Sequence, residues 1–247
     1  MKISPRLQLI ASLVQHHYDD IWDCCCDHGL LGANLLENHP DSTLHFVDVV
    51  PDLMQEISVK LNHFYPASAE GITRWQVHCL DVALLPLADN THRQLIIIAG
   101  VGGDLLIRLV EAILKAHPHH HLEFILCPVQ HTFAVRKSLQ QHKLGLICEH
   151  LIEDNRRFYE VLHVSTQSQV KITAIGSQMW DLTRTRDQRY LHKTLSHYQR
   201  IQTGSQNKLM TQKVDSLNST DFHTELSTII EAYQALLAMI PSPSLRS

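Results

Sequence analysis

Carboxylates follow three successive apolar segments in the first third of the chain. Asp23 lies at the end of the first segment, directly before Cys24-Cys25-Cys26-Asp27-His28-Gly29, Asp48 ends the second, and Asp81 follows the third. Asp48 comes 19 residues after Gly29, close to the roughly 20-residue spacing at which an acid accepts hydrogen bonds from ribose hydroxyls. Any one of these acids is also an ordinary cap. Three of them at successive strand ends favour a nucleoside ligand.

Glycines dominate a second segment, Ile97-Ile98-Ala99-Gly100-Val101-Gly102-Gly103. Because glycine has no Cβ atom, a flat ring can approach the backbone there. The competing interpretation is a tight turn between a strand and a helix, with Asp104 capping that helix.

Apolar segments typical of buried strands alternate with amphipathic segments typical of helices. A final strand pair is joined by only four turn residues, so it must be antiparallel. We therefore expect an α/β fold with a doubly wound, seven-stranded sheet. The expected strands are 21–25, 44–49, 75–79, 94–99, 123–127, 146–152 and 158–164, and the expected helices are 6–16, 28–38, 52–64, 105–116 and 133–142.

This Rossmann-like architecture matches S-adenosylmethionine-dependent methyltransferases better than the all-parallel dinucleotide-binding fold. In both, the cofactor lies at the carboxyl ends of the strands, near the switch in strand order. We expect Asp23 to orient the loop and accept a hydrogen bond from the amino acid moiety of the cofactor. Asp48 is expected to meet the ribose, and Asp81 the exocyclic amine of adenine.

After Gly176 the pattern changes to helices alone, at about 183–202 and 222–240, which predicts a helical hairpin. The predicted domains are therefore a catalytic domain at 1–170 and a helical domain at 171–247. The first helix carries a basic strip, which we interpret either as a solvated face or as a track for RNA phosphates. Its members are Arg186, Arg189, Lys193, His197 and Arg200.

Charge and composition narrow the function classes. The whole chain carries a net charge of -4, which gives no global case for nucleic-acid binding. No apolar run approaches the roughly 20 residues that a membrane span needs, so we expect a cytoplasmic protein without a membrane partner. The six cysteines lack a Cys-x-x-Cys pair, and the loop histidines His117 and His119–His121 lack carboxylates at ligand spacing other than Glu123. We therefore expect reduced thiols and no metal.

Four motifs carry a family resemblance. They are DHGLLG at 27–32, IIAGVGGDLLIRLV at 97–110, CPVQHTFAVRKSL at 127–139 and EDNRRFYEVL at 153–162, and the opening Ser4-Pro5-Arg6-Leu7 agrees with them. Together they resemble the bacterial tRNA adenine-22 N1-methyltransferase family. The resemblance covers residues 3–165 closely and the tail only in its helical character.

The resemblance implies a site and a mechanism. Adenine N1 would attack the sulfonium methyl of S-adenosylmethionine in line, with the enzyme supplying position and a desolvated slot. Because N1 is a pairing edge, the base must be unpaired or flipped, and no covalent nucleophile is needed. The implied cofactor-binding residues are Asp23, Cys25, Asp27, His28, Gly29, Asp48, Asp81, Ala99, Gly100 and Gly102. The candidate catalytic residues are Asp27, His28 and Gly100, and the candidate tRNA-binding residues are Arg186, Arg189, Lys193 and Arg200.

Two departures from the family pattern keep alternatives open. Cys25 and Cys26 stand where the family has a glycine and a serine, and Cys127-Pro128-Val129 stands where it has Gln-Pro-Asn. We consider Gln130 a candidate replacement for the lost amides. The alternatives are a methyltransferase acting on another RNA or a small molecule, and a non-enzymatic tRNA-binding or scaffold relative.

Overall fold

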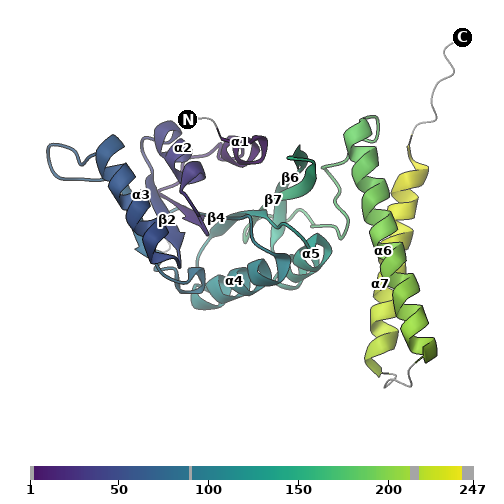
Figure 1. Ribbon diagram of the computed structural model, residues 1–247. Helices are drawn as coiled ribbons and strands as arrows, with labels where there is room; N and C mark the ends of the chain where they lie inside the picture. Colours follow the sequence, from purple (N-terminus) through teal and green to yellow (C-terminus); the bar gives the residue numbers. More distant parts are fainter. Residues whose placement is uncertain (1–2, 89–90, 212–216, 241–247) are drawn as a thin grey trace, which may run out of the picture. The chain divides into compact units, whose positions relative to one another are not determined.

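The computed structural model describes residues 3–88, 91–211 and 217–240, whose path is shown in Figure 1. The chain divides into two compact units, Met1–Ile172 and Thr173–Ser247.

Seven strands form one sheet in the first unit, in the spatial order β3-β2-β1-β4-β5-β7-β6. Strands β1 to β5 are parallel, and β7 runs antiparallel to both β5 and β6. The doubly wound, seven-stranded sheet predicted from the sequence is confirmed. The strands are β1 (Asp20–Cys24), β2 (Thr43–Asp48), β3 (Trp75–Cys79), β4 (Gln94–Ala99), β5 (Leu122–Cys127), β6 (Gly145–Asp154) and β7 (Arg157–Ser165).

The direction of winding switches between two neighbouring strands. β1 and β4 pair although β2 and β3 lie between them in the sequence. The chain leaves β1 toward a helix on one face of the sheet and leaves β4 toward a helix on the other face. Doubly wound sheets bind ligands at the carboxyl ends of the strands beside such a switch.

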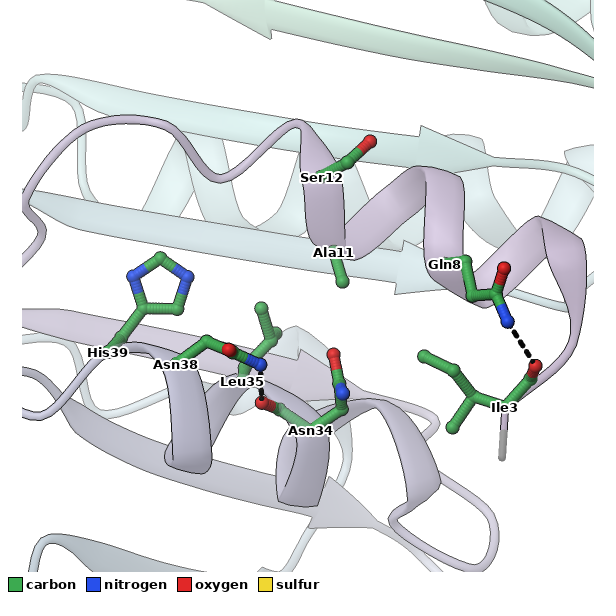
Figure 2. A pocket seen from close by; sticks show the side chains of 8 residues that line it. All are labelled: Ile3, Gln8, Ala11, Ser12, Asn34, Leu35, Asn38 and His39. Atoms are coloured by element: carbon green, nitrogen blue, oxygen red, sulfur yellow. Dashed lines mark hydrogen bonds between the residues drawn. The ribbon is translucent and has the colours of Figure 1, made fainter. Parts of the chain in front are cut away.

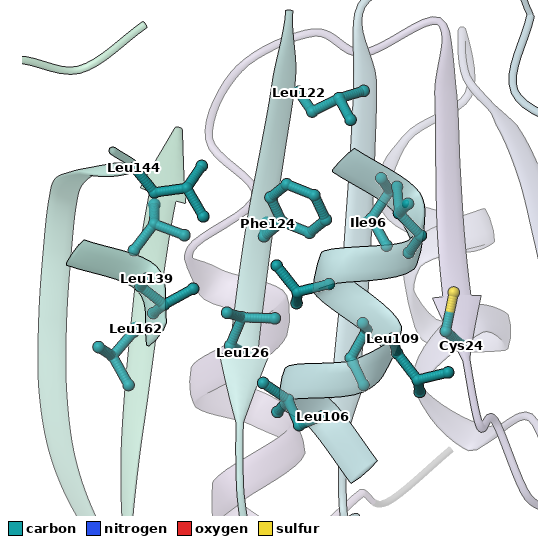
Figure 3. Close-up of a cluster of buried hydrophobic side chains, with 14 of the residues drawn as sticks. Cys24, Ile96, Leu106, Leu109, Leu122, Phe124, Leu126, Leu139, Leu144 and Leu162 are labelled. Atoms are coloured by element: carbon teal, nitrogen blue, oxygen red, sulfur yellow. The ribbon is translucent and has the colours of Figure 1, made fainter. Parts of the chain in front are cut away.

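Helices cover both faces of the sheet and bury two separate apolar cores. The helices α1 (Pro5–Ser12), α2 (Leu30–Asn38) and α3 (Pro51–Phe64) pack on one face. The helices α4 (Gly103–Ala116) and α5 (Thr132–Gln141) pack on the other, where Leu106 and Leu109 of α4 lie in one cluster with Ile96 and Phe124 of the sheet (Figure 3). The short 3₁₀ helix η1 (Val82–Leu84) joins this second core.

The first helix is shorter than the sequence predicts. Its apolar spacing indicated a helix to residue 16, whereas α1 ends at Ser12. Val14 supplied part of that spacing, and it is buried just after the helix ends, as is Leu13. Apolar burial therefore continues past the point where the helical hydrogen bonding stops.

A buried ion cluster fixes α5 against the last two strands. Arg136 of α5 lies 2.6 Å from the Glu149 carboxylate of β6 and 2.7 Å from the Glu160 carboxylate of β7. All three side chains are at most 2% exposed. Their attraction in this low-dielectric interior holds the helix that begins directly after the β5 loop.

The second unit is a helical hairpin of α6 (Thr185–Thr211) and α7 (Leu217–Ala238). Leu191 and Leu195 of α6 are buried together with an apolar stripe of α7, and Tyr198 stacks on Tyr233 with their ring centroids 5.9 Å apart. Both helices extend beyond the predicted ranges, α6 at its end and α7 at its beginning. The unit carries no sheet in the part that the structure describes.

Candidate active site

Asp23 is buried where β1 meets the loop that leads into α2. One of its carboxylate oxygens accepts a 2.8 Å hydrogen bond from the backbone N–H of Gly32, in the first turn of α2. A Cβ atom at Gly32 would lie 2.3 Å from Cε1 of Phe46, so only glycine allows this approach of α2 to β2. The DHGLLG motif thus brings the first turn of the helix onto the acid.

Burial governs the ionisation of this acid. Asp23 is only 4% exposed. Desolvation raises the pKa of its carboxyl to about 7, the hydrogen bond from Gly32 opposes the rise, and the negative charge of Asp48 adds to it. Asp23 therefore changes charge near neutral pH, and a cationic ligand would favour its ionised form.

The loop after Asp23 takes an unusual backbone path. Cys25 and Asp27 have φ values of 56° and 51°, in the left-handed region where glycine is the least strained residue. Gly29, with φ 68°, caps α2. The resembling family has glycine at the position of Cys25, so this chain keeps the left-handed turn without the residue that favours it.

Asp48 ties this loop to the next one. Its Oδ1 accepts hydrogen bonds from the backbone N–H groups of Val49 (2.8 Å) and Val50 (3.2 Å), and its Oδ2 accepts one from Asp27 (3.2 Å). The carboxylate therefore organises two strand-to-helix loops at once. Its partly exposed position leaves room for a ligand hydroxyl on the same oxygens.

The three predicted acids gather around one thiol. The pKa of Cys25 is raised to about 11, first by burial and then by the charges of Asp48, Asp23 and Asp81, in that order. Burial also raises the pKa values of Cys24 and Cys26. Protonated thiols are poor nucleophiles, which agrees with a mechanism without covalent catalysis.

Asp81 is the third acid of the cluster that Asp23 and Asp48 begin. Its Oδ1 accepts a 2.9 Å hydrogen bond from the Ala83 backbone and caps η1. Exposed apolar side chains flank these acids, namely Val49 at 62% and Leu84 at 72% exposure. Carboxylates beside apolar surface suit a ligand that has polar edges and a flat apolar face.

Asp27 and His28 lie on the exposed side of the same loop. His28 Nε2 is 3.7 Å from the Asp27 carboxylate, and the side chains of His28 and Asp27 are 56% and 74% exposed, respectively. Both can reach a ligand from solvent, but neither is held in a dry pocket.

The glycine segment runs beside the loop that follows β5. Gly100 has φ 84°, and its N–H donates to the carbonyl of Cys127 at 3.1 Å. A Cβ atom at Gly102 would lie 3.4 Å from the side-chain amide nitrogen of Gln130. The amide of Gln130 therefore lies next to the bare backbone, although the Gln-Pro-Asn pattern is absent. Ala99, the last residue of β4, is partly buried directly before this segment.

Sequence reasoning assigned no role to two residues that the fold brings here. The guanidinium of Arg6 would be 3.7 Å from a Cβ atom at Gly100, and its Cζ is 4.8 Å from the ring centroid of Tyr159. Both residues lie within motifs that resemble the family. Nothing in their spacing, however, indicates that they meet at the end of β4.

The candidate RNA-binding residues lie on α6 of the second unit. Arg189, Lys193 and Arg200 are exposed. Arg186 is partly buried, and its Nε donates a 2.7 Å hydrogen bond to Asp187, a carboxylate with no exposure. Arg186 therefore helps to hold the start of the helix.

A cavity of about 330 Å³ lies away from the acid cluster, between α1 and α2. Figure 2 shows that Gln8 and Ser12 line it from α1, and that Asn34 and Asn38 line it from α2. None of the predicted cofactor-binding or catalytic residues lines it.

Three of the four loop histidines hydrogen-bond to other protein groups. His117 and His120 bond to the carbonyls of Leu85 and Ala88 at 3.0 and 2.8 Å, and His121 bonds to Gln167 at 2.6 Å. Within the described ranges, no group of three or more His, Cys, Asp or Glu side chains is arranged to hold a metal ion. No helix in those ranges is long and apolar enough to cross a membrane.

Comparisons with known proteins bear on the family and the fold. The family model described as a methyltransferase domain matches residues 3–162. No curated protein sequence gives a significant match.

Solved structures resemble nearly the whole chain. The B. subtilis M1A22 tRNA methyltransferase TrmK is 20% identical with a TM-score of 0.66, over 95% of this chain and 98% of that one. A putative tRNA (m1A22) methyltransferase from Streptococcus pneumoniae, solved with S-adenosyl-L-methionine, is 22% identical with a TM-score of 0.57, over 96% and 100%. M. capricolum TrmK, solved with S-adenosyl-homocysteine, is 14% identical with a TM-score of 0.67, over 98% and 100%. At such identities the likeness shows the fold.

Proposed function

The chain belongs to the methyltransferase domain family, and we propose that it transfers a methyl group from S-adenosylmethionine to N1 of adenine-22 in tRNA. The observation that carries this proposal is the convergence of Asp23, Asp48 and Asp81 around the Cys25 thiol, at the carboxyl ends of β1, β2 and β3. The structural neighbours solved with S-adenosylmethionine or its product support the choice of cofactor.

The hydrogen-bond acceptors present fit this cofactor. S-adenosylmethionine supplies a methyl group on a sulfonium cation, and its amino acid moiety adds an ammonium. In our proposal Asp23 holds the ammonium, and its ionisation is favoured by that positive charge. Asp48 accepts from the ribose hydroxyls, and Asp81 accepts from the adenine amine, while Val49 and Leu84 contact the flat face of the base.

The first loop completes the proposed cofactor site. Gly29 turns the loop into α2 with a φ of 68°, and Cys25 packs partly on the sheet core, which draws its side chain from open space. We assign Asp27 and His28 to the rim of the site. There the Asp27 carboxylate and the neighbouring His28 side chain can relieve the positive charge that methylation leaves on adenine.

Gly100 and Gly102 provide the proposed slot for the target base. Both lack side chains, and the amide of Gln130 lies at the edge of the slot, 3.4 Å from a Cβ atom placed on Gly102. An amide at this place can donate to or accept from the edge of a base. We therefore assign to Gln130 the recognition that the absent Gln-Pro-Asn segment would otherwise supply.

The second unit is the proposed contact to the rest of the tRNA. Residues 176–247 carry 8 Lys and Arg against 6 Asp and Glu, whereas residues 1–175 carry 13 against 19. Arg189, Lys193 and Arg200 lie exposed on α6 and can neutralise phosphates. A tRNA substrate of this kind agrees with the cytoplasmic location expected from the sequence.

Cofactor binding is the first test. The reduced protein is titrated with S-adenosylmethionine by calorimetry, alongside Asp48→Ala and the matched control Asp41→Ala, which removes an exposed acid outside the site. We expect binding in the wild type and the control, with a loss of at least tenfold in affinity for Asp48→Ala. Equal affinity in all three proteins would place the cofactor elsewhere.

Acceptor identity is the second test. Labelled methyl transfer is measured to an unmodified tRNA transcript with adenine at position 22, and to the same transcript with guanine there. We expect incorporation only with adenine. Charge reversal of Arg189 and Lys193 should raise KM for tRNA and leave the affinity for the cofactor unchanged.

A second candidate is a methyltransferase with a different acceptor. The acidic first unit and the missing amides of the Gln-Pro-Asn segment favour it. Cofactor binding without transfer to either transcript would select this candidate. Binding of tRNA without binding of cofactor would select a non-enzymatic relative.

A further inference from the structure

We propose that Arg6 binds a backbone phosphate of the acceptor RNA and thereby positions the target nucleotide over Gly100. This inference rests on the proposed function, because it requires a polynucleotide at the glycine segment. Nothing in the roles assigned above involves Arg6.

The position of the guanidinium is the first argument. Nη1 of Arg6 would lie 3.7 Å from a Cβ atom at Gly100, so the cation borders the backbone that the target base is proposed to approach. Arg6 also contacts Cys127, the last residue of β5. Arg6 lies in α1, near the start of the sequence and far along the chain from Gly100 and Cys127. Only the folding of the first unit brings these residues together.

The support beneath Arg6 is the second argument. Its Cζ lies 4.8 Å from the ring centroid of Tyr159, which is cation–π geometry. Contact with the ring restrains the guanidinium, whose Nη1 lies on the side of Gly100. A preorganised fork of donors loses little conformational freedom when it binds an oxyanion.

The unpaired charge is the third argument. Among the described residues, no carboxylate forms an ion pair with Arg6, and its Nε is buried without a hydrogen-bond partner. The nearby Glu160 is engaged by Arg136 at 2.7 Å. Arg6, whose side chain also bonds the Cys127 thiol, therefore places beside Gly100 a positive charge that no carboxylate of the described residues neutralises.

Charge balance selects phosphate over the base as the partner. Methylation at N1 leaves a positive charge on adenine, and a fixed cation against the ring would oppose that change. A phosphodiester is anionic throughout the reaction and accepts two parallel hydrogen bonds from a guanidinium. Arg6 therefore acts as a positioning residue, outside the group of catalytic residues.

Salt-dependent RNA binding tests the proposal. Affinity for unmodified tRNA is measured over a range of salt concentrations for the wild type, Arg6→Gln, Arg6→Lys and the control Lys115→Gln. Lys115 is an exposed cation near the other end of α4. We expect Arg6→Gln to weaken binding about tenfold and to reduce the slope of log K against log salt by about 1. The control should keep the wild-type slope.

The lysine variant separates a phosphate contact from a structural role. Arg6→Lys keeps the charge and loses the planar fork, so it should restore the slope and recover only part of the affinity. Binding of S-adenosylmethionine by calorimetry should be unchanged in both variants. A loss of cofactor affinity in Arg6→Gln would instead mean that the site has deformed, and would overturn the proposal.

The failures of the two proposals are distinguishable. If wild-type protein binds tRNA and Arg6→Gln keeps both its affinity and its salt slope, the role of Arg6 is refuted and the proposed function stands. If the wild type does not bind tRNA at any salt concentration, both are refuted.

Discussion

The buried carboxyl of Asp23 should make the first unit less stable as pH rises through neutrality. Its pKa in the folded chain is about 7, against 3.8 for the unfolded group. Between these values the folded state binds a proton that the unfolded state does not, so unfolding releases a proton and rising pH favours it. The contribution is fully present below about pH 4 and is lost as pH rises through 7.

The magnitude follows from the size of the shift. About three pKa units correspond to about 4 kcal/mol over the whole range, of which roughly 2 to 3 kcal/mol falls between pH 5 and 8. Asp23→Asn places a neutral amide at the same site, and its oxygen can still accept from the Gly32 N–H. The variant should therefore lack this part of the pH dependence.

Urea unfolding across this pH range measures the effect. A Trp180→Phe background leaves Trp22 and Trp75, both in the first unit, as the fluorescent probes. We expect the free energy of unfolding of the protein that keeps Asp23 to fall by roughly 2 to 3 kcal/mol relative to Asp23→Asn between pH 5 and 8. The exposed Asp41→Asn control should follow the wild-type curve.

The cofactor gives an internal check on this reasoning. Saturating S-adenosylmethionine should flatten the decline with pH, because its cationic groups hold Asp23 ionised in the folded state. Parallel curves for the wild type and the Asp23→Asn variant without cofactor would refute the argument, since they would mean that the carboxyl ionises as easily in the fold as in the unfolded chain.

Three further predictions concern packing and backbone strain, each measured as the free energy of unfolding in urea. Arg136→Met should destabilise the first unit by about 3 to 5 kcal/mol, because it leaves two buried glutamates without a partner; a change below about 1 kcal/mol would mean that water reaches them. Gly32→Ala should cost about 1 to 3 kcal/mol, because its Cβ would overlap the Phe46 ring at 2.3 Å, and no cost would show that α2 shifts freely. Cys25→Gly should be more stable than Cys25→Ala by about 1 kcal/mol, because both lose the thiol and only glycine relieves the left-handed backbone at φ 56°; an alanine variant of equal stability would contradict the strain.

Much of the fold was predictable because it rests on local patterns. The unbroken apolar run of β4 requires burial on both faces, and the short link between Ile152 and Phe158 permits only an antiparallel pair. The end of α1 was not predictable in this way. Val14 fits a helical spacing and is buried as expected, but it lies beyond the end of the helix. Hydrophobic periodicity predicts which residues are buried. It does not predict the residue at which the helical hydrogen bonding ends.

In the candidate site, too, some features follow from the sequence and others depend on tertiary contacts. The sequence by itself determined that Asp23, Asp48 and Asp81 end up at one edge of the sheet, because the carboxyl ends of parallel strands share an edge. Only the tertiary structure decided that the three charges converge on Cys25, that Gln130 lies beside Gly102, and that Arg6 stacks on Tyr159 at the end of β4. The physical reason is that strand order and hydrophobic pattern are encoded in neighbouring residues, whereas contacts between distant loops depend on how two cores pack on the two faces of the sheet.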